Sequence, residues 1–143
     1  MYDQTINILL VEDDDFDIMN VQRAFKKGEI FNPLYVANNG LQALEILRGG
    51  SGSSVVFPTH RRLILLDLNM PKMNGLEFLK ALRSDPDLKR TPVVVLTTSN
   101  EDRDRIEAYE LNVAGYLLKP VTFSSFVELM VTLNKYWGFS RIP

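Results

Sequence analysis

Short apolar runs that end abruptly in polar residues recur along the chain. Continuous runs of this kind are typical of strands that are buried on both faces of a parallel sheet. Four of them end at a charged or hydroxyl residue, and a weaker one precedes an Asn-Asn-Gly turn. In chain order, the predicted strands are Ile6–Val11, Leu34–Ala37, Leu63–Leu66, Val93–Leu96 and Gly115–Leu118.

Amphipathic segments follow each of these strands. Their apolar residues recur three or four positions apart, which places them on one face of a helix. The predicted helices contain Ile18–Phe25, Leu41–Leu47, Leu76–Leu82, Asp102–Leu111 and Phe123–Trp137. Five alternations of strand and helix predict an α/β fold built on a doubly wound, five-stranded parallel sheet.

Composition favours one globular domain. The chain has 143 residues, of which 45% are hydrophobic and 24% charged, enough for a full core. We therefore expect a single domain over residues 1–143, with a core over about 6–137 and a C-terminal tail over 138–143. The sequence shows no signal peptide and no stretch long enough to span a membrane.

Charge and cysteine content narrow the class of partner. Sixteen basic and eighteen acidic residues leave a net charge of −2, so binding to nucleic acid is not expected. The absence of cysteine excludes disulfides and thiolate metal sites, and it fits a cytoplasmic location. The only histidine, His60, follows a Gly- and Ser-rich segment, Gly49–Ser54, in a predicted surface loop. With no second ligand nearby in sequence, His60 is interpreted as a solvated loop residue.

The polar residues at the strand ends form the candidate site. In an open parallel sheet, ligands bind outside the carboxyl ends of the strands, so these residues are expected to converge. They are Glu12, Asp13, Asp67, Thr97 and Lys119. Clustered carboxylates repel one another unless a cation such as Mg²⁺ neutralises them. Aspartate can accept phosphoryl groups covalently, so the set predicts a Mg²⁺-dependent phosphoryl site with Asp67 as the nucleophile.

Each residue taken alone also has a structural explanation. Asp14 or Asp15 can cap the first helix, where acidic residues are favourable. Asp67 can be a turn residue and Thr97 a cap for the fourth helix. Lys119 can be an ordinary solvated lysine. These explanations do not account together for four strands that end in chemically complementary groups, so the joint pattern favours the phosphoryl site.

Four motifs occur in order along the chain: ILLVEDD, LILLDLNMPKMNG, PVVVLTTS and AGYLLKP. Together they resemble the motifs of the response-regulator receiver family, whose members have a flavodoxin-like (CheY-like) fold. The resemblance covers about residues 6–137 and implies the strand order 2-1-3-4-5. It also implies a signalling protein rather than an enzyme, one that accepts a phosphoryl group from a sensor histidine kinase. Such a protein assists its own phosphorylation and dephosphorylation.

The resemblance assigns a role to each site residue. Asp67 would be the phosphoacceptor, Asp13 would bind Mg²⁺ directly and Glu12 would bind it through water. The main-chain carbonyl of Asn69 would be a further ligand, and Mn²⁺ or Ca²⁺ could replace Mg²⁺. Lys119 would pair with the phosphoryl oxygens.

The resemblance also implies a switch. Thr97 would be the switch hydroxyl, and Tyr116 the aromatic residue whose orientation follows it. From the residues alone, Tyr116 can equally be a half-buried aromatic side chain on an edge strand. In the family, the bond between Lys119 and Pro120 is usually cis, which proline tolerates better than other residues.

We expect no output domain after the predicted fifth helix, and we therefore expect the signal to leave through protein binding. The C-terminal segment NKYWGFSRIP gathers aromatic and apolar residues, which either form an interface or fold back over their own domain. The KYWG and IP ending resembles single-domain response regulators paired with phytochromes. This narrower resemblance implies a phytochrome-type histidine kinase as donor. It also implies a homodimer formed through the face of the fourth helix, fifth strand and fifth helix, or through the tail.

Two rival functions remain. A haloacid-dehalogenase-like aspartyl phosphohydrolase also uses an aspartate at a strand end, but it needs a second aspartate two residues on, where this chain has Asn69. The other rival is a receiver that only scaffolds without switching. The intact set of Asp13, Asp67, Thr97 and Lys119 argues against a scaffold without a switch.

Overall fold

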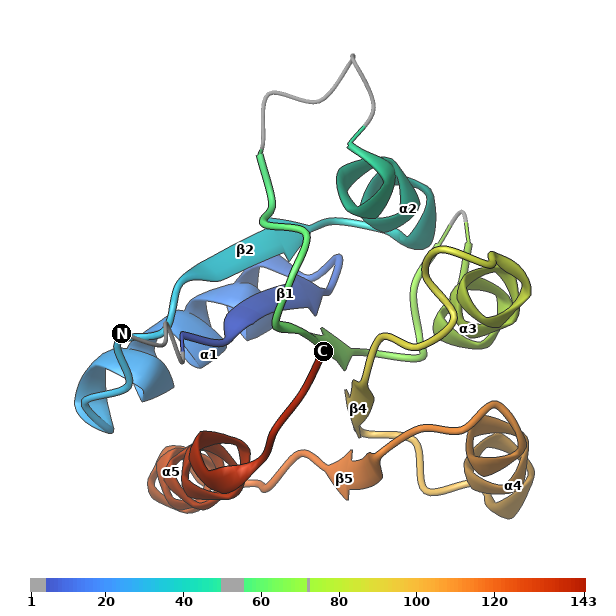
Figure 1. The fold of residues 1–143 in the computed structure, drawn as a ribbon. Coiled ribbons are helices and arrows are strands. Elements are labelled where there is room, and N and C mark those ends of the chain that lie inside the picture. The colour runs from blue at the N-terminus through green and yellow to red at the C-terminus, as the bar shows by residue number, and fades with distance from the viewer. Residues whose placement is uncertain (1–4, 50–55, 72) are drawn as a thin grey trace.

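The computed structural model describes residues 5–49, 56–71 and 73–143, which form a sheet with helices on both faces (Figure 1). Within these residues, five parallel strands lie in the order β2-β1-β3-β4-β5. The strands are β1 (Asn7–Val11), β2 (Leu34–Ala37), β3 (Arg62–Leu66), β4 (Val93–Thr97) and β5 (Gly115–Leu118). The predicted fold class and strand order are confirmed.

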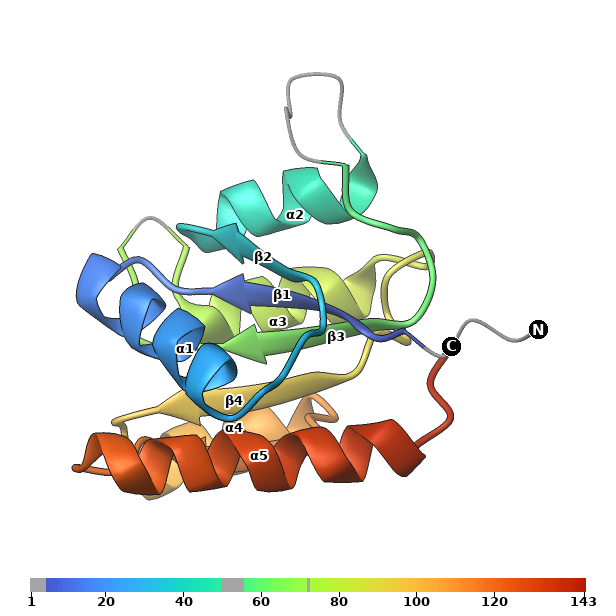
Figure 2. The ribbon, with the colours of Figure 1, turned by 90° about the vertical axis from the view of Figure 1, so that its left-hand side faces the viewer.

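The helices follow the strands in strict alternation. They are α1 (Asp15–Lys27), α2 (Gly40–Arg48), α3 (Gly75–Ser84), α4 (Asp102–Glu110) and α5 (Phe123–Phe139). Helices α1 and α5 cover one face of the sheet, and α2, α3 and α4 cover the other (Figure 1). Figure 2 shows β1 to β4 running in one direction, with the C-terminus at their amino ends, and β5 pairs parallel to β4. The candidate site therefore lies at the opposite end of the sheet from the C-terminus.

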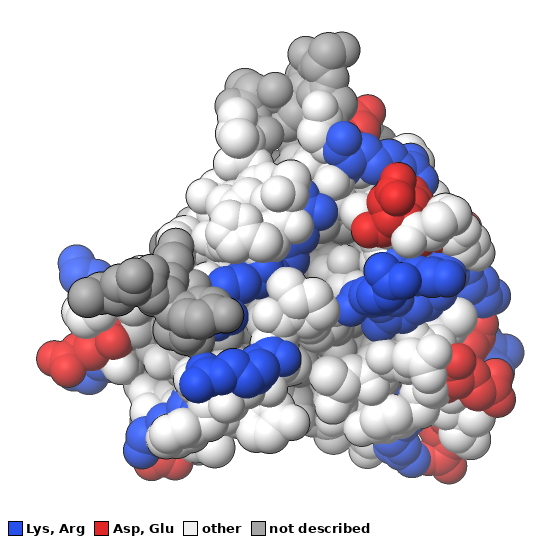
Figure 3. All heavy atoms as spheres, viewed as in Figure 1, with Lys and Arg blue, Asp and Glu red and all other residues white. Residues whose placement is uncertain are grey.

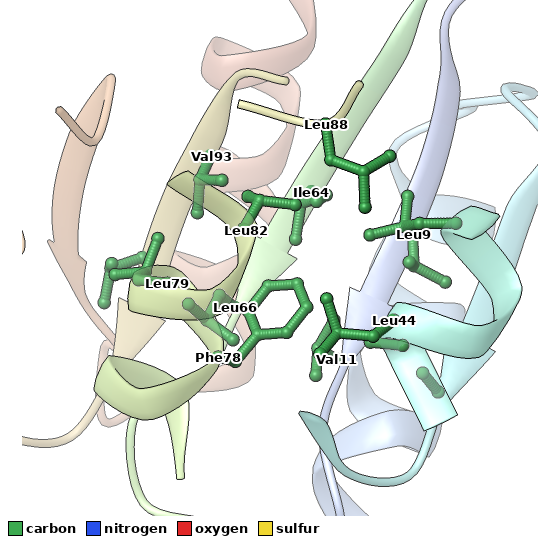
Figure 4. Packing of buried hydrophobic residues seen from close by; sticks show 14 of the residues in the cluster. Leu9, Val11, Leu44, Ile64, Leu66, Phe78, Leu79, Leu82, Leu88 and Val93 are labelled. Carbon is green, nitrogen blue, oxygen red and sulfur yellow. The ribbon is translucent and has the colours of Figure 1, made fainter. Parts of the chain in front are cut away.

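Strand β1 shows why a continuous apolar run is needed here. Leu9 and Val11 pack toward α2 and α3, whereas Ile8 and Leu10 pack toward α1 and α5. Successive side chains of a strand point to opposite faces, so a sheet covered on both sides needs apolar residues at every position. In the cluster on the α3 side, the ring of Phe78 lies between Val11 and Leu66 (Figure 4).

Asparagine and aspartate side chains begin three of the helices. The Asp14 carboxylate caps α1, as one of the sequence interpretations had it, and Asp15 is the first helical residue. Asn39 caps α2, and Asn74 forms a reciprocal capping box at the start of α3. Helix α4 has no side-chain cap, so the alternative role of Thr97 as its cap is wrong.

The C-terminal segment folds back on its own domain in part. Trp137 is only 6% exposed and belongs to the core cluster between the sheet and helices α1 and α5. Ile142 packs against the same cluster. Tyr136 and Phe139 stay 64% and 87% exposed. The segment therefore folds back at Trp137 and Ile142, whereas an interface at Tyr136 and Phe139 stays a prediction. Helix α5 extends past the predicted end at Trp137.

Three local features complete the comparison with the sequence. His60 is exposed, as predicted, while residues 50–55 of the Gly- and Ser-rich segment lie outside the described residues. The bond between Lys119 and Pro120 is trans, so the cis form implied by the resemblance is wrong. Trans is the lower-energy isomer of most bonds before proline. Among the described residues, no helix has the length and apolar character that crossing a bilayer requires.

Candidate functional site

Parallel strand pairing brings the predicted site residues to one edge of the sheet. The N–H of Asp67 donates to the carbonyl of Val11 at 3.1 Å, which places the residue after β3 beside the end of β1. The N–H of Lys119 donates to the carbonyl of Thr97 at 2.9 Å, which ties the residue after β5 to the end of β4. Main-chain hydrogen bonds thus position these residues independently of the contacts between their side chains.

Three carboxylates form the centre of the site. Glu12, Asp13 and Asp67 each offer an oxygen atom, and these atoms lie within 4.8 Å of one another. Glu12 is 2% exposed and Asp67 is 7% exposed, whereas Asp13 is the most accessible of the three. Glu12 also orients its neighbour, since its Oε2 accepts from the N–H of Asp13 at 3.0 Å. Such a set of hard oxygen donors suits a divalent cation.

Burial gives Glu12 a distinct protonation state. It raises the pKa of the Glu12 carboxyl to about 8, although Lys119 acts in the opposite direction. The nearby charge of Asp67 adds to the rise. In the absence of a cation, the cluster therefore relieves its repulsion by keeping a proton on Glu12 near neutral pH.

Lys119 lies beside two of these three carboxylates. Its ammonium nitrogen, Nζ, is 2.8 Å from Oε1 of Glu12 and 3.6 Å from Oδ2 of Asp67. Burial alone would lower the pKa of Lys119, but the neighbouring carboxylates outweigh it and raise that pKa. Lys119 therefore carries a full positive charge next to Asp67, and the interpretation of a solvated lysine is wrong, since its side chain is only 13% exposed.

The sequence analysis missed a fourth acidic residue. Asp17, on the first turn of α1, places Oδ2 3.2 Å from Nζ of Lys119. A signal was present, because Asp17 lies in the acidic segment that directly follows β1. It was obscured because acidic residues at a helix start are already explained by the helix dipole.

The loop after β3 holds Asp67 in place. The N–H of Asn69 points to Oδ1 of Asp67 at 3.4 Å, while Asn69 itself is exposed. At the other end of the loop, the N–H of Gly75 donates to the carbonyl of Leu68 at 3.0 Å. A Cβ atom on Gly75 would lie 2.6 Å from the main-chain oxygen of Asp67. Only glycine lets α3 begin this close to the candidate phosphoacceptor.

Ser99 connects the other two predicted residues. Thr97 is fully buried, and its hydroxyl oxygen accepts from the N–H of Ser99 at 3.2 Å. The hydroxyl of half-buried Tyr116 donates to the carbonyl of Ser99 at 3.0 Å. Burial raises the pKa of Tyr116, which keeps the phenol protonated as a donor. The Ser99 hydroxyl donates to Asp104 of α4 at 2.7 Å, so the end of β4 is linked to both β5 and α4.

This arrangement has close counterparts among known proteins. A family model described as the response regulator receiver domain matches residues 8–131. The probable methanogenesis regulatory protein FilR2 of Methanothrix harundinacea is 37% identical over 95% of this chain and 86% of its own length. Response regulator Rcp1 of Synechocystis is 40% identical over 91% of this chain and 87% of its own length.

Solved structures agree with the sequence relatives. The phosphorylated cyanobacterial phytochrome response regulator RcpA superposes with a TM-score of 0.85 at 34% identity, covering 97% of this chain and 99% of its own. The Mn²⁺-bound form of Rcp1 gives a TM-score of 0.83 at 38% identity, covering 96% and 99%. With the acidic strand ends, the lysine after β5 and this likeness together, the chain belongs to the response-regulator receiver family, the phosphoryl receivers of two-component systems.

Proposed function

We propose that Asp67 accepts a phosphoryl group from a phosphohistidine of a sensor histidine kinase. The P–N bond of the donor breaks as a bond forms between phosphorus and a carboxylate oxygen of Asp67. The observation that carries this proposal is the placement of Asp67 within 4.8 Å of two further carboxylates and 3.6 Å from Nζ of Lys119. Such transfer depends mainly on alignment and on neutralising the phosphoryl oxygens.

A divalent cation supplies the remaining positive charge, and we assign Mg²⁺ to this role. Asp13 and Asp67 would bind it directly, Glu12 through water, and the main-chain carbonyl of Asn69 as a further ligand. The donor set fits, because Mg²⁺ prefers one or two carboxylates together with water and phosphate oxygens. The bound Mn²⁺ in the related Rcp1 supports a divalent cation site in this family.

Thr97 and Tyr116 form the proposed switch. A phosphoryl group on Asp67 adds acceptor oxygens, to which the Thr97 hydroxyl would donate. In this structure the Thr97 hydroxyl accepts from the N–H of Ser99. Movement of Thr97 would therefore disturb Ser99, which is hydrogen-bonded to both Tyr116 and Asp104. The readout would then reach α4 and β5, on the same side of the molecule.

We further propose a phytochrome-type histidine kinase as donor and a homodimer as the signalling form. The relatives Rcp1, RcpA and a bacteriophytochrome response regulator support the pairing. For the dimer, candidate contacts are the exposed apolar residues of α4 and β5, Ile106, Tyr109 and Leu118. Tyr136 and Phe139 at the end of α5 form the alternative contact.

The test is phosphorylation with acetyl phosphate and Mg²⁺, followed by intact-mass spectrometry. We expect one added phosphoryl group in the natural chain and none in Asp67→Asn. Asp87→Asn is the matched control, since Asp87 is an exposed aspartate after α3, and it is expected to be labelled normally. Label that persists in Asp67→Asn would contradict the site. Steady hydrolysis of a simple phosphomonoester would instead favour the phosphohydrolase.

A further inference from the structure

The ammonium of Lys119 is held by an acidic residue that the proposed phosphoryl chemistry does not use. Glu12 and Asp67 belong to the site, but Asp17 comes from α1. Nζ lies 2.8 Å from Glu12 and 3.2 Å from Asp17, both within hydrogen-bond distance. The 3.6 Å separation from Asp67 is too long for a hydrogen bond. In this state the ammonium therefore bonds to Glu12 and Asp17.

The position of Asp17 is fixed by the helix that carries it. The Asp14 cap sets the start of α1, and Asp17 lies in the first turn of that helix. The side chains of Asp17 and Lys119 are 30% and 13% exposed, so their contact is partly shielded from water. Both line a groove of about 360 Å³ between α1 and the segment that follows β5. A partly buried ion pair of this kind is screened less by water and salt than a fully exposed pair.

We infer that Asp17 is a positioning residue that retains the Lys119 ammonium on the α1 side and opposes its transfer to a phosphoryl group on Asp67. This inference rests on the proposed function of Asp67. A lysine ammonium has three N–H donors, and the bond to Asp17 occupies one of them. The ammonium lies 3.6 Å from Asp67, so it must move to reach phosphoryl oxygens there, and its attraction to the Asp17 carboxylate opposes that movement. Asp17 thereby sets how strongly the site holds its phosphoryl group.

The substitution Asp17→Asn keeps the size of the side chain and removes the competing charge. We expect it to tighten the binding of beryllofluoride, a phosphoryl-like anion that adds to aspartate in the presence of Mg²⁺. The expected gain in affinity is about two- to fivefold, the range of a partly exposed ion pair. A change that merely damaged the site would weaken binding, so the direction of the effect distinguishes positioning from damage.

The experiment measures beryllofluoride binding by fluorine NMR for the natural chain, Asp17→Asn and Asp15→Asn, each at saturating Mg²⁺. Asp15 is an exposed aspartate in the same turn of α1, so its substitution removes the same charge without touching Lys119. Tighter binding in Asp17→Asn alone is the expected result. Equal, weaker or Asp15-like binding in Asp17→Asn would overturn the role of Asp17. If the natural chain binds no beryllofluoride, the proposed function of Asp67 fails instead.

Discussion

A buried carboxyl group at position 12 couples cation binding to a proton. The pKa of Glu12 rises from 4.5 to about 8 because the folded chain removes it from water. Between these pH values the folded, metal-free protein keeps a proton that the unfolded chain has lost. Its stability therefore falls as pH rises from about 4.5 to 8 and stays lower above that range. A cation that occupies the cluster would remove this penalty.

Mg²⁺ affinity is expected to increase between pH 6 and pH 8.5 for this reason. Near pH 7, binding would release about one proton, since a divalent cation next to Glu12 favours the ionised form of its carboxyl group even through a bridging water. Calorimetric titrations in two buffers with different ionisation enthalpies would measure the release. In Glu12→Gln the release is expected to disappear and the affinity to become nearly independent of pH. An unchanged release in that variant would contradict the assignment to Glu12.

At the residue scale, the sequence predicted the groups that end strands. Glu12, Asp13, Asp67 and Lys119 could be found because each follows an apolar run whose end is sharp. Their positions at one sheet edge then follow from parallel pairing. Asp17 could not be found in the same way, because a helix start offers several acidic residues and only the packing of α1 decides which one reaches Lys119.

At the element scale, Arg83 connects α3 to the segments before β4 and after α4 through hydrogen bonds. The helical periodicity of the sequence does not predict these contacts. Its guanidinium donates to the carbonyls of Lys89 and Thr91, both at 2.8 Å, in the segment before β4. It also donates to the carbonyls of Leu111 and Asn112, at 2.7 and 3.0 Å, at the end of α4. The apolar stripe of α3 could be predicted, but these partners are far apart in sequence.

Arg83→Met is expected to lower the free energy of unfolding by about 2 kcal/mol or more, because four backbone acceptors lose a charged donor. Arg83→Lys is expected to recover little of this, because a lysine cannot present a planar fork of donors. Urea unfolding would measure both. Lys89→Met, at an exposed position nearby, is the control and should change stability by less than about 0.5 kcal/mol. Equal effects of Arg83→Met and Lys89→Met would show that the network contributes nothing.

At the scale of the whole molecule, the two ends of the strands carry different arrangements of charged side chains. The carboxyl ends of the strands carry the acidic cluster of the site. At the amino ends, Lys and Arg side chains spread across the surface, with most acidic side chains toward its margins (Figure 3). The net charge of −2 predicted no binding to nucleic acid, but a net charge does not show how the charged side chains are distributed over the surface. That distribution depends on the fold, which brings strand ends from distant parts of the sequence close together.

Light scattering would decide between the two proposed dimer contacts. One variant, Ile106→Lys with Tyr109→Lys, changes the exposed face of α4, and the other, Tyr136→Ser with Phe139→Ser, changes the end of α5. The natural chain is expected to have the mass of a dimer after treatment with beryllofluoride and Mg²⁺. The variant that falls to the monomer mass identifies the contact. A dimer mass retained in both variants would contradict both contacts.

The buried indole of Trp137 gives the protein an intrinsic fluorescent probe of its own core packing. It is the only tryptophan of the chain, and it lies in the core near the end of α5, where it lines a small cavity together with Ile6 and Ile8 at the start of β1. Its emission therefore senses whether α1, α5 and the sheet are packed together, at the far end from Asp67. Intrinsic fluorescence is thus a measure of unfolding that is separate in space from the phosphoryl site, so stability and activation can be followed independently in one sample.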